Sequence, residues 1–152
     1  HFVRNGLSLH LCGLVLAMNG VMICLFEVPL AVGLRLWPVR QVLALGYLLV
    51  GASFLTFLIS GSLGAFVVMI IVFTIGEMSA FSRQQAYSAS LAPDDMRGRY
   101  VGFLSFAWCA GNTASSALGM PLYDHHPTAL WTLNATLGVV AAALILYSRR
   151  TT

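Results

Sequence analysis

The sequence is poor in charge and has no lysine. Charged residues make up 9% of the 152 residues and hydrophobic residues 59%, with a mean hydropathy of +0.85. Soluble domains carry about 25% charged residues, so this composition excludes an ordinary soluble domain. The net charge is +3, but the sequence has no lysine and so lacks the lysine-bearing basic face that nucleic-acid binding needs. We therefore predict a lipid bilayer, and no nucleic acid, as the partner of this chain.

Cysteine is also scarce, and its placement argues against chemistry. The three cysteines, Cys12, Cys24 and Cys109, all fall in apolar stretches. An odd number of separated thiols without a nearby histidine suits neither a disulfide framework nor a metal site. We interpret them as small packing residues and predict no metal and no cofactor.

Reactive constellations are missing as well. The sequence has no Gly-rich phosphate loop, no His-Glu-x-x-His motif and no nucleophile elbow. The aspartates, Asp94, Asp95 and Asp124, all lie between apolar runs, where they cannot form an intramembrane catalytic pair. We predict that the chain is not an enzyme.

Long uncharged runs are what the sequence has in place of these features. A hydrocarbon core about 30 Å thick needs roughly 20 apolar residues of helix to cross it. Such runs predict an all-α, polytopic membrane helix bundle in which residues 1–152 form one transmembrane region with no soluble domain. The five predicted spans are residues 9–34, 42–59, 63–87, 101–123 and 129–147.

The arginines predict how these spans are oriented. Basic residues in short loops are retained in the cytoplasm. Pairs of arginines occur in the first link, in the third link and after the last span, whereas Arg4 is alone on the other side. We therefore predict an external N-terminus and a cytoplasmic C-terminus. The three pairs are Arg35 and Arg40, Arg97 and Arg99, and Arg149 and Arg150.

Glu77 is the first of two acidic residues within predicted spans. An ionised side chain inside a bilayer is costly unless it is paired, protonated or hydrated, and such residues often mark ion or proton pathways. Glu77 would lie in the cytoplasmic half of the third span. Two interpretations stay open: a proton or cation site, or a structural partner of Arg83 or Arg99.

Glu27 is the second acidic residue, and it precedes Pro29, which frees a backbone carbonyl and favours a kink. Glu27 is either a gating or coupling residue or an interfacial acid paired with Arg35 or Arg40. Asn19 lies one to two turns before it. This amide is either a cavity donor or the donor of an interhelical hydrogen bond.

The fourth span carries small residues at four-residue spacing. Gly111, Ser115 and Gly119 form a stripe that lets two helix backbones approach closely. We predict helix packing through this stripe. Asn112 lies beside it, and both a cavity-facing and a structural role are open for its amide.

Two sequence elements resemble the carboxy-terminal half of a major facilitator superfamily transporter, particularly drug/proton antiporter-like members. The first is Glu27-Val28-Pro29-Leu30 followed by the basic link 35–40. The second is Gly76-Glu77-Met78, the Ala92-Pro93 turn and the helix start Arg97-Gly98-x-Tyr100-x-Gly102. The chain departs from the pattern in two places: no aspartate accompanies the arginines of the first link, and residues 81–87 lack the usual proline.

The resemblance implies that the five spans are helices eight to twelve, and that the partner is a missing amino-terminal half. Spans one, three and four would line a cavity, and spans two and five would brace them against lipid. The implied function is proton-coupled export of a small molecule by alternating access in a bacterial inner membrane. The implied cavity or coupling residues are Glu77, Glu27, Asn19 and Asn112, and those of a cytoplasmic latch are Arg35, Arg40, Asp94, Asp95, Arg97 and Arg99.

The start of the sequence fits a fragment of a longer protein. It begins at His1, with no initiating methionine and no signal-peptide pattern. The alternative is a self-contained five-span membrane subunit or a small oligomeric channel, for which the stripe on the fourth span would supply the contact surface.

Overall fold

The computed structural model describes residues 8–148, and every regular element in that range is a helix. This confirms the predicted all-α class. The helices are joined by short links, which leave no room for a soluble domain between them. In chain order they are α1 (Leu9–Gly33), α2 (Val39–Ser53), α3 (Thr56–Ile59), α4 (Leu63–Leu91), α5 (Arg97–His125) and α6 (Pro127–Tyr147).

Four helical stretches within the described residues are long and apolar enough to cross a membrane. They are Leu9–Gly33, Val39–Ile59, Leu63–Leu91 and Pro127–Tyr147. The remaining predicted span, 101–123, lies within the continuous helix α5, which is 29 residues long but less apolar than the other four. Glycine, serine, threonine and asparagine in α5 lower its hydropathy.

Local chemistry at the helix ends explains where the helices begin. The Ser8 hydroxyl accepts a hydrogen bond from the Leu11 N–H, and the Ser62 hydroxyl accepts one from the Ala65 N–H, both at 3.3 Å. These are N-cap contacts that satisfy otherwise unpaired backbone donors. Pro127 opens α6, where its fixed φ suits the first helical position.

The second predicted span is interrupted, because α2 ends at Ser53 and α3 begins at Thr56. The Ser53 hydroxyl donates to the Val50 carbonyl at 2.7 Å, and the Thr56 hydroxyl donates to the Ser53 carbonyl at 2.7 Å. Hydroxyls that bond to nearby carbonyls compete with the helical ladder. The segment 42–59 carries no charge, and its high hydropathy predicts one unbroken span.

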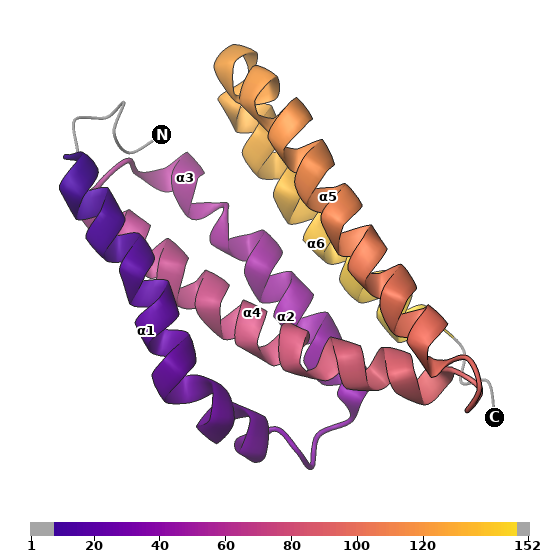
Figure 1. Ribbon diagram of the computed structural model, residues 1–152. Coiled ribbons are helices and arrows are strands. Elements are labelled where there is room, and N and C mark those ends of the chain that lie inside the picture. The colour runs from indigo at the N-terminus through magenta and orange to yellow at the C-terminus, as the bar shows by residue number, and fades with distance from the viewer. Residues whose placement is uncertain (1–7, 149–152) are drawn as a thin grey trace.

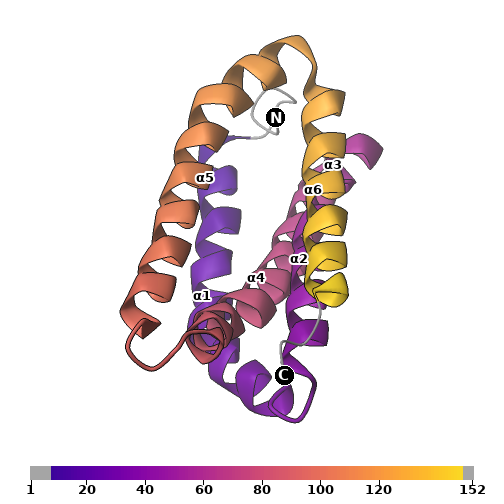
Figure 2. The same cartoon turned by 90° about the vertical axis from the view of Figure 1, so that its right-hand side faces the viewer.

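α2 occupies the centre of the described bundle. It packs against α4 on one side and α6 on the other, while α1 packs on α4 (Figure 1). α5 and α6 run antiparallel and diverge from the link that joins them, as Figure 2 shows, while Figure 1 shows α5 apart from α1. One face of α2 nevertheless stays exposed through Leu45 and Leu48, and Leu55 in the link to α3 is exposed as well. The bracing role predicted for spans two and five is compatible with this packing, and their contact with lipid stays a prediction.

Close glycine contacts hold α2 to both neighbours. A Cβ added at Gly46 would lie 2.8 Å from the Gly76 carbonyl oxygen, and one at Gly138 would lie 2.7 Å from the Tyr47 carbonyl oxygen. Gly51 faces Gly138 in the second contact. Backbones can approach this closely only where side chains are absent, as expected where burial from water does not drive helix association.

The predicted stripe on α5 is not one of these contacts. A Cβ added at Gly111 or Gly119 would meet no atom within 4 Å, and Ser115 is exposed. Within residues 8–148, close packing therefore occurs at other glycines than the predicted ones. A packing role for Gly111, Ser115 and Gly119 stays a prediction. It would require a partner surface outside the described bundle.

The cysteines differ in their surroundings. Cys12 is buried in an apolar cluster between α1 and α4, with Val15 and Phe66 among its members. Cys24 and Cys109 are exposed. The described bundle therefore agrees with the interpretation as a packing residue for Cys12, and for Cys24 and Cys109 this interpretation stays a prediction.

Candidate functional site

A polar cluster joins α1 to α4. The Asn19 side-chain amide donates to the Thr74 hydroxyl oxygen at 2.9 Å and to the Glu77 carboxylate at 3.1 Å. Thr74 is fully buried, and its own hydroxyl donates to the Ile70 carbonyl at 2.6 Å. Asn19 and Glu77 are half-buried. One amide group thus satisfies two acceptors on the neighbouring helix.

The carboxylate in this cluster has no basic partner among the described residues. Glu77 accepts from Asn19, and neither Arg83 nor Arg99 forms an ion pair with it in residues 8–148. The structural alternative that paired Glu77 with one of these arginines is therefore wrong here. Counted from Leu63 at about 1.5 Å per residue, Glu77 lies roughly 20 Å along α4. The acid is held by a neutral amide deep within a helix of membrane-spanning length.

The sequence predicted two members of the cluster separately, and the structure brings them together. It missed the third, Thr74, because a hydroxyl within an apolar run usually bonds to its own helix. A signal was available, since Thr74 precedes Glu77 by three residues and residues at that spacing share a helix face.

Glu27 is half-buried on α1, eight residues after Asn19. It forms no ion pair with Arg35 or Arg40 in the described part of the chain, so the predicted interfacial pairing is wrong. Pro29 lies inside α1, and Figure 1 shows this helix changing direction toward its C-terminal end.

Asn112 lies apart from the cluster. Its side-chain amide donates to the Trp108 carbonyl of its own helix at 3.1 Å, and the residue is exposed. It lines an open hollow on α5 together with Thr113, Ser116 and Ala117. The structure therefore does not bring Asn112 to Asn19 and Glu77.

Arg40, predicted as part of a latch, binds the end of α6. Its Nε donates to the Ile145 carbonyl at 2.9 Å, and its Nη2 donates to the carbonyls of Ile145 and Leu146. A guanidinium at this position satisfies carbonyls that the last helical turn leaves unpaired and complements the helix dipole. These hydrogen bonds of Arg40 connect the start of α2 to the end of α6.

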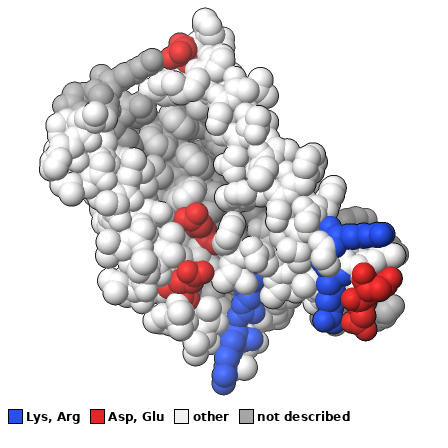
Figure 3. Space-filling model, in the orientation of Figure 1, with Lys and Arg blue, Asp and Glu red and all other residues white. Residues whose placement is uncertain are grey.

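The remaining latch candidates lie on the surface. Arg97 pairs with Asp94 at 2.8 Å, and both side chains are exposed. Arg35, Asp95 and Arg99 form no ion pair within residues 8–148. In Figure 3 the basic side chains gather toward one end of the molecule, while acidic side chains also border a hollow farther along it.

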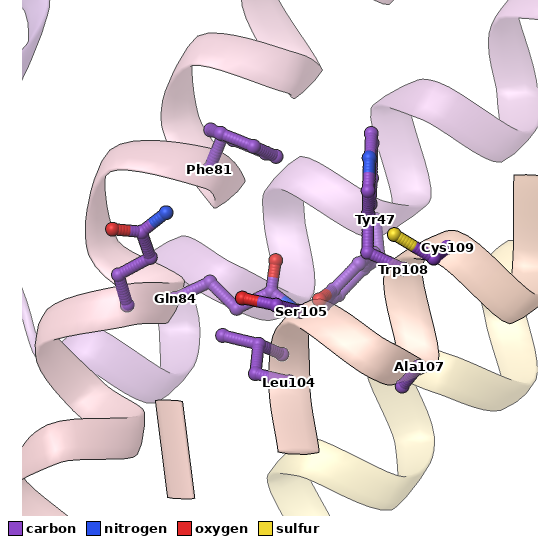
Figure 4. Close-up of a pocket in the computed structure, with 9 residues that line it drawn as sticks. Tyr47, Phe81, Gln84, Leu104, Ser105, Ala107, Trp108 and Cys109 are labelled. Carbon is purple, nitrogen blue, oxygen red and sulfur yellow. The ribbon is translucent and has the colours of Figure 1, made fainter. Parts of the chain in front are cut away.

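A pocket of about 350 Å³ opens between α2, α4 and α5. The Phe81 and Trp108 rings meet edge to face at its wall, with centroids 5.2 Å apart. Figure 4 shows α4 and α5 side chains lying on facing sides of this space. The pocket was not predicted from the sequence, although positions 77, 81, 84 and 85 lie on one stripe of α4. The lining residues are Tyr47, Phe81, Gln84, Gln85, Leu104, Ser105, Ala107, Trp108 and Cys109.

Comparison with known proteins gives one family. The profile of the Major Facilitator Superfamily matches residues 3–152. An uncharacterized MFS-type transporter of Bacillus subtilis, YttB, is 26% identical over 149 residues, which is 95% of this chain and 38% of that protein. A Na(+), Li(+), K(+)/H(+) antiporter of Planococcus maritimus is 31% identical over 99 residues, 65% of this chain and 23% of the antiporter.

A second Bacillus subtilis relative, the uncharacterized MFS-type transporter YqjV, is 29% identical over 105 residues, 69% of this chain and 25% of that protein. The chain thus spans well under half the length of the curated relatives it matches. No solved structure matches.

Proposed function

The chain belongs to the major facilitator superfamily, and from this premise we propose that it is part of a secondary transporter that exports a small molecule by alternating access coupled to protons. The family indicates a multi-pass membrane transporter and not an enzyme. The antiporter among the relatives supports exchange against protons. The observation that carries the proposal is the Asn19–Thr74–Glu77 cluster.

Glu77 is the proposed proton-binding group. As a carboxylate it accepts a charge-assisted hydrogen bond from Asn19, and such bonds are roughly twice as strong as neutral ones. Protonation removes the charge and weakens the link between α1 and α4. A ligand or proton shifts a conformational equilibrium only by binding one state better than the other. The cluster supplies such a difference in proton affinity if the Asn19–Glu77 hydrogen bond is formed in one conformation and broken in the other.

The proposed setting is the carboxy-terminal half of the transporter, with the predicted spans as helices eight to twelve. The partial coverage of the relatives supports a missing amino-terminal half as the partner. α5, with its lower hydropathy and its exposed Asn112, suits a helix that faces a water-filled cavity. Glu27 stays a second candidate for coupling.

The proposed orientation places the arginine-rich end in the cytoplasm, with the bacterial inner membrane as the location. Positive residues in short loops are retained on the cytoplasmic side. The surface charges at that end are the proposed latch, in which Arg35, Asp95, Arg97 and Arg99 meet the other half of the protein in one conformation. The Arg97–Asp94 pair is exposed and therefore available for such an exchange.

Everted membrane vesicles that contain the full-length protein test this function. After respiration has acidified the vesicle interior, addition of a transported substrate is expected to dissipate the pH gradient in proportion to the amount of protein. Sodium, lithium and potassium salts and neutral aromatic compounds are the first substrates to add. Vesicles without the protein serve as the control. A substrate flux that proceeds with no accompanying proton movement would contradict proton coupling.

A further inference from the structure

We propose that the pocket between α2, α4 and α5 binds an uncharged planar aromatic molecule that carries a hydrogen-bonding edge. Its volume, about 350 Å³, lies within the range of small-molecule sites. In naming the substrate class, this inference rests on the proposed transport function. Binding itself is a separate property that can be measured without transport.

The pocket has the aromatic wall that such a ligand needs. Phe81 and Trp108 meet at an interplanar angle of 69°, and an edge-to-face pair leaves ring surface free for a third ring. Both residues are still substantially exposed, at 41% and 52%. This aromatic surface is therefore not consumed by the packing of the helices.

Polar groups lie on the same pocket without partners in the described chain. The side-chain amides of Gln84 and Gln85 form no hydrogen bond within residues 8–148, and neither does the Tyr47 hydroxyl. Figure 4 shows Gln84 and Ser105 among the side chains that line this space, together with Tyr47. Amides can both donate and accept, so they suit the edge of a carboxamide or a heterocycle.

The lining contains no acidic and no basic side chain. A permanently charged ligand would therefore enter without a counter-charge, at a cost in desolvation. Glu77 lies one helical turn before Phe81, on the same stripe of α4. A neutral ligand can thus occupy the pocket while the carboxylate remains free to exchange protons.

Equilibrium binding to the full-length protein in lipid nanodiscs tests this inference. The probes are naphthamide, its cationic analogue naphthylmethylamine, its anionic analogue naphthoate, and decanamide, which has the amide but no ring. Naphthamide is expected to bind most tightly. Trp108→Leu and Phe81→Leu are each expected to weaken its binding about tenfold, the loss expected for an aromatic contact plus ring burial. Gln84→Leu should weaken binding of naphthamide more than binding of naphthalene.

Phe103→Leu is the matched control, because Phe103 lies on α5, is 72% exposed and does not line the pocket. If Trp108→Leu fails to fold, Phe81→Leu supplies the comparison. Tighter binding of naphthylmethylamine, equal binding of decanamide, or equal losses with Phe103→Leu would each overturn the proposal. Naphthamide binding is measured at equilibrium without a proton gradient, whereas proton coupling is measured by gradient-driven transport, so each proposal can fail without the other.

Discussion

Among single residues, one side-chain amide links two helices and holds the proposed coupling acid. Asn19 donates to Thr74 and Glu77, and no arginine neutralises the carboxylate within residues 8–148. A polar group inside a membrane-spanning segment is retained only where a partner satisfies it. The cluster satisfies its members through a neutral amide and without a basic residue among those described.

Thr74→Val tests the structural part of this cluster. Valine keeps the branched shape of the fully buried side chain but cannot accept from Asn19. Interhelical hydrogen bonds in membranes contribute about 0.6 kcal/mol on average and up to about 1.7 kcal/mol. We expect a loss of stability in that range, measured by unfolding in mixed detergent micelles. Thr74→Ser, which keeps the hydroxyl, is the control, and an equal loss in both variants would contradict the hydrogen-bond explanation.

At the scale of elements, the glycine contacts of α2 decide how the helices associate. Gly46 meets Gly76 of α4, and Gly51 meets Gly138 of α6. Arg40 adds a hydrogen bond between the start of α2 and the end of α6. α4, which carries Glu77, is therefore positioned by its contacts with α2.

Gly46→Ala is expected to separate α2 from α4. The added Cβ would lie 2.8 Å from both the Gly76 carbonyl oxygen and the Ala80 Cβ, and this backbone cannot move aside cheaply. Overpacking costs roughly 1–3 kcal/mol, against a gain in helix propensity of about 1 kcal/mol. A net loss of stability should therefore appear in micelle unfolding, with faster hydrogen exchange in α2. In Gly64→Ala, where the nearest atom is 3.9 Å away, stability should not fall; a smaller effect of Gly46→Ala than of this control would contradict the packing.

The sequence predicts the elements better than their contacts. Hydropathy places the helices within a few residues, because the bilayer thickness fixes the length of an apolar run. It does not reveal the break after Ser53, since hydroxyl-to-carbonyl bonds leave no trace in hydropathy. The stripe on α5 has a repeat that predicts packing, whereas Gly46 has none, and only the fold shows which glycines meet a neighbour. The pocket was missed for the same reason: it joins residues from three helices.

At the scale of the whole molecule, charge is segregated along the bundle. The arginines of the described residues gather toward one end, as Figure 3 shows. Large apolar side chains are exposed on every long helix, including Leu14, Leu48, Val68 and Leu144. Such a surface suits lipid and a further set of helices, in agreement with relatives that are much longer than this chain.

The orientation gives a prediction at this scale. In a full-length protein without other cysteines, Ser62→Cys should react with a membrane-impermeant maleimide in intact spheroplasts, and Asp95→Cys should react only in everted vesicles. Ser62 lies in the link between α3 and α4, and Asp95 lies in the link between α4 and α5, at the opposite end of α4. The reverse pattern would show that the arginine-rich end faces outward.

The most direct test of the central claim compares Glu77→Gln with Glu27→Gln in proteoliposomes that contain the full-length protein. Glutamine keeps the shape and the hydrogen-bonding capacity of glutamate but cannot exchange a proton. The account predicts that Glu77→Gln abolishes substrate uptake driven by a pH gradient while retaining substrate exchange at equal pH, and that Glu27→Gln has the smaller effect. Gradient-driven uptake that survives unchanged in Glu77→Gln would contradict the claim that this carboxyl couples transport to protons.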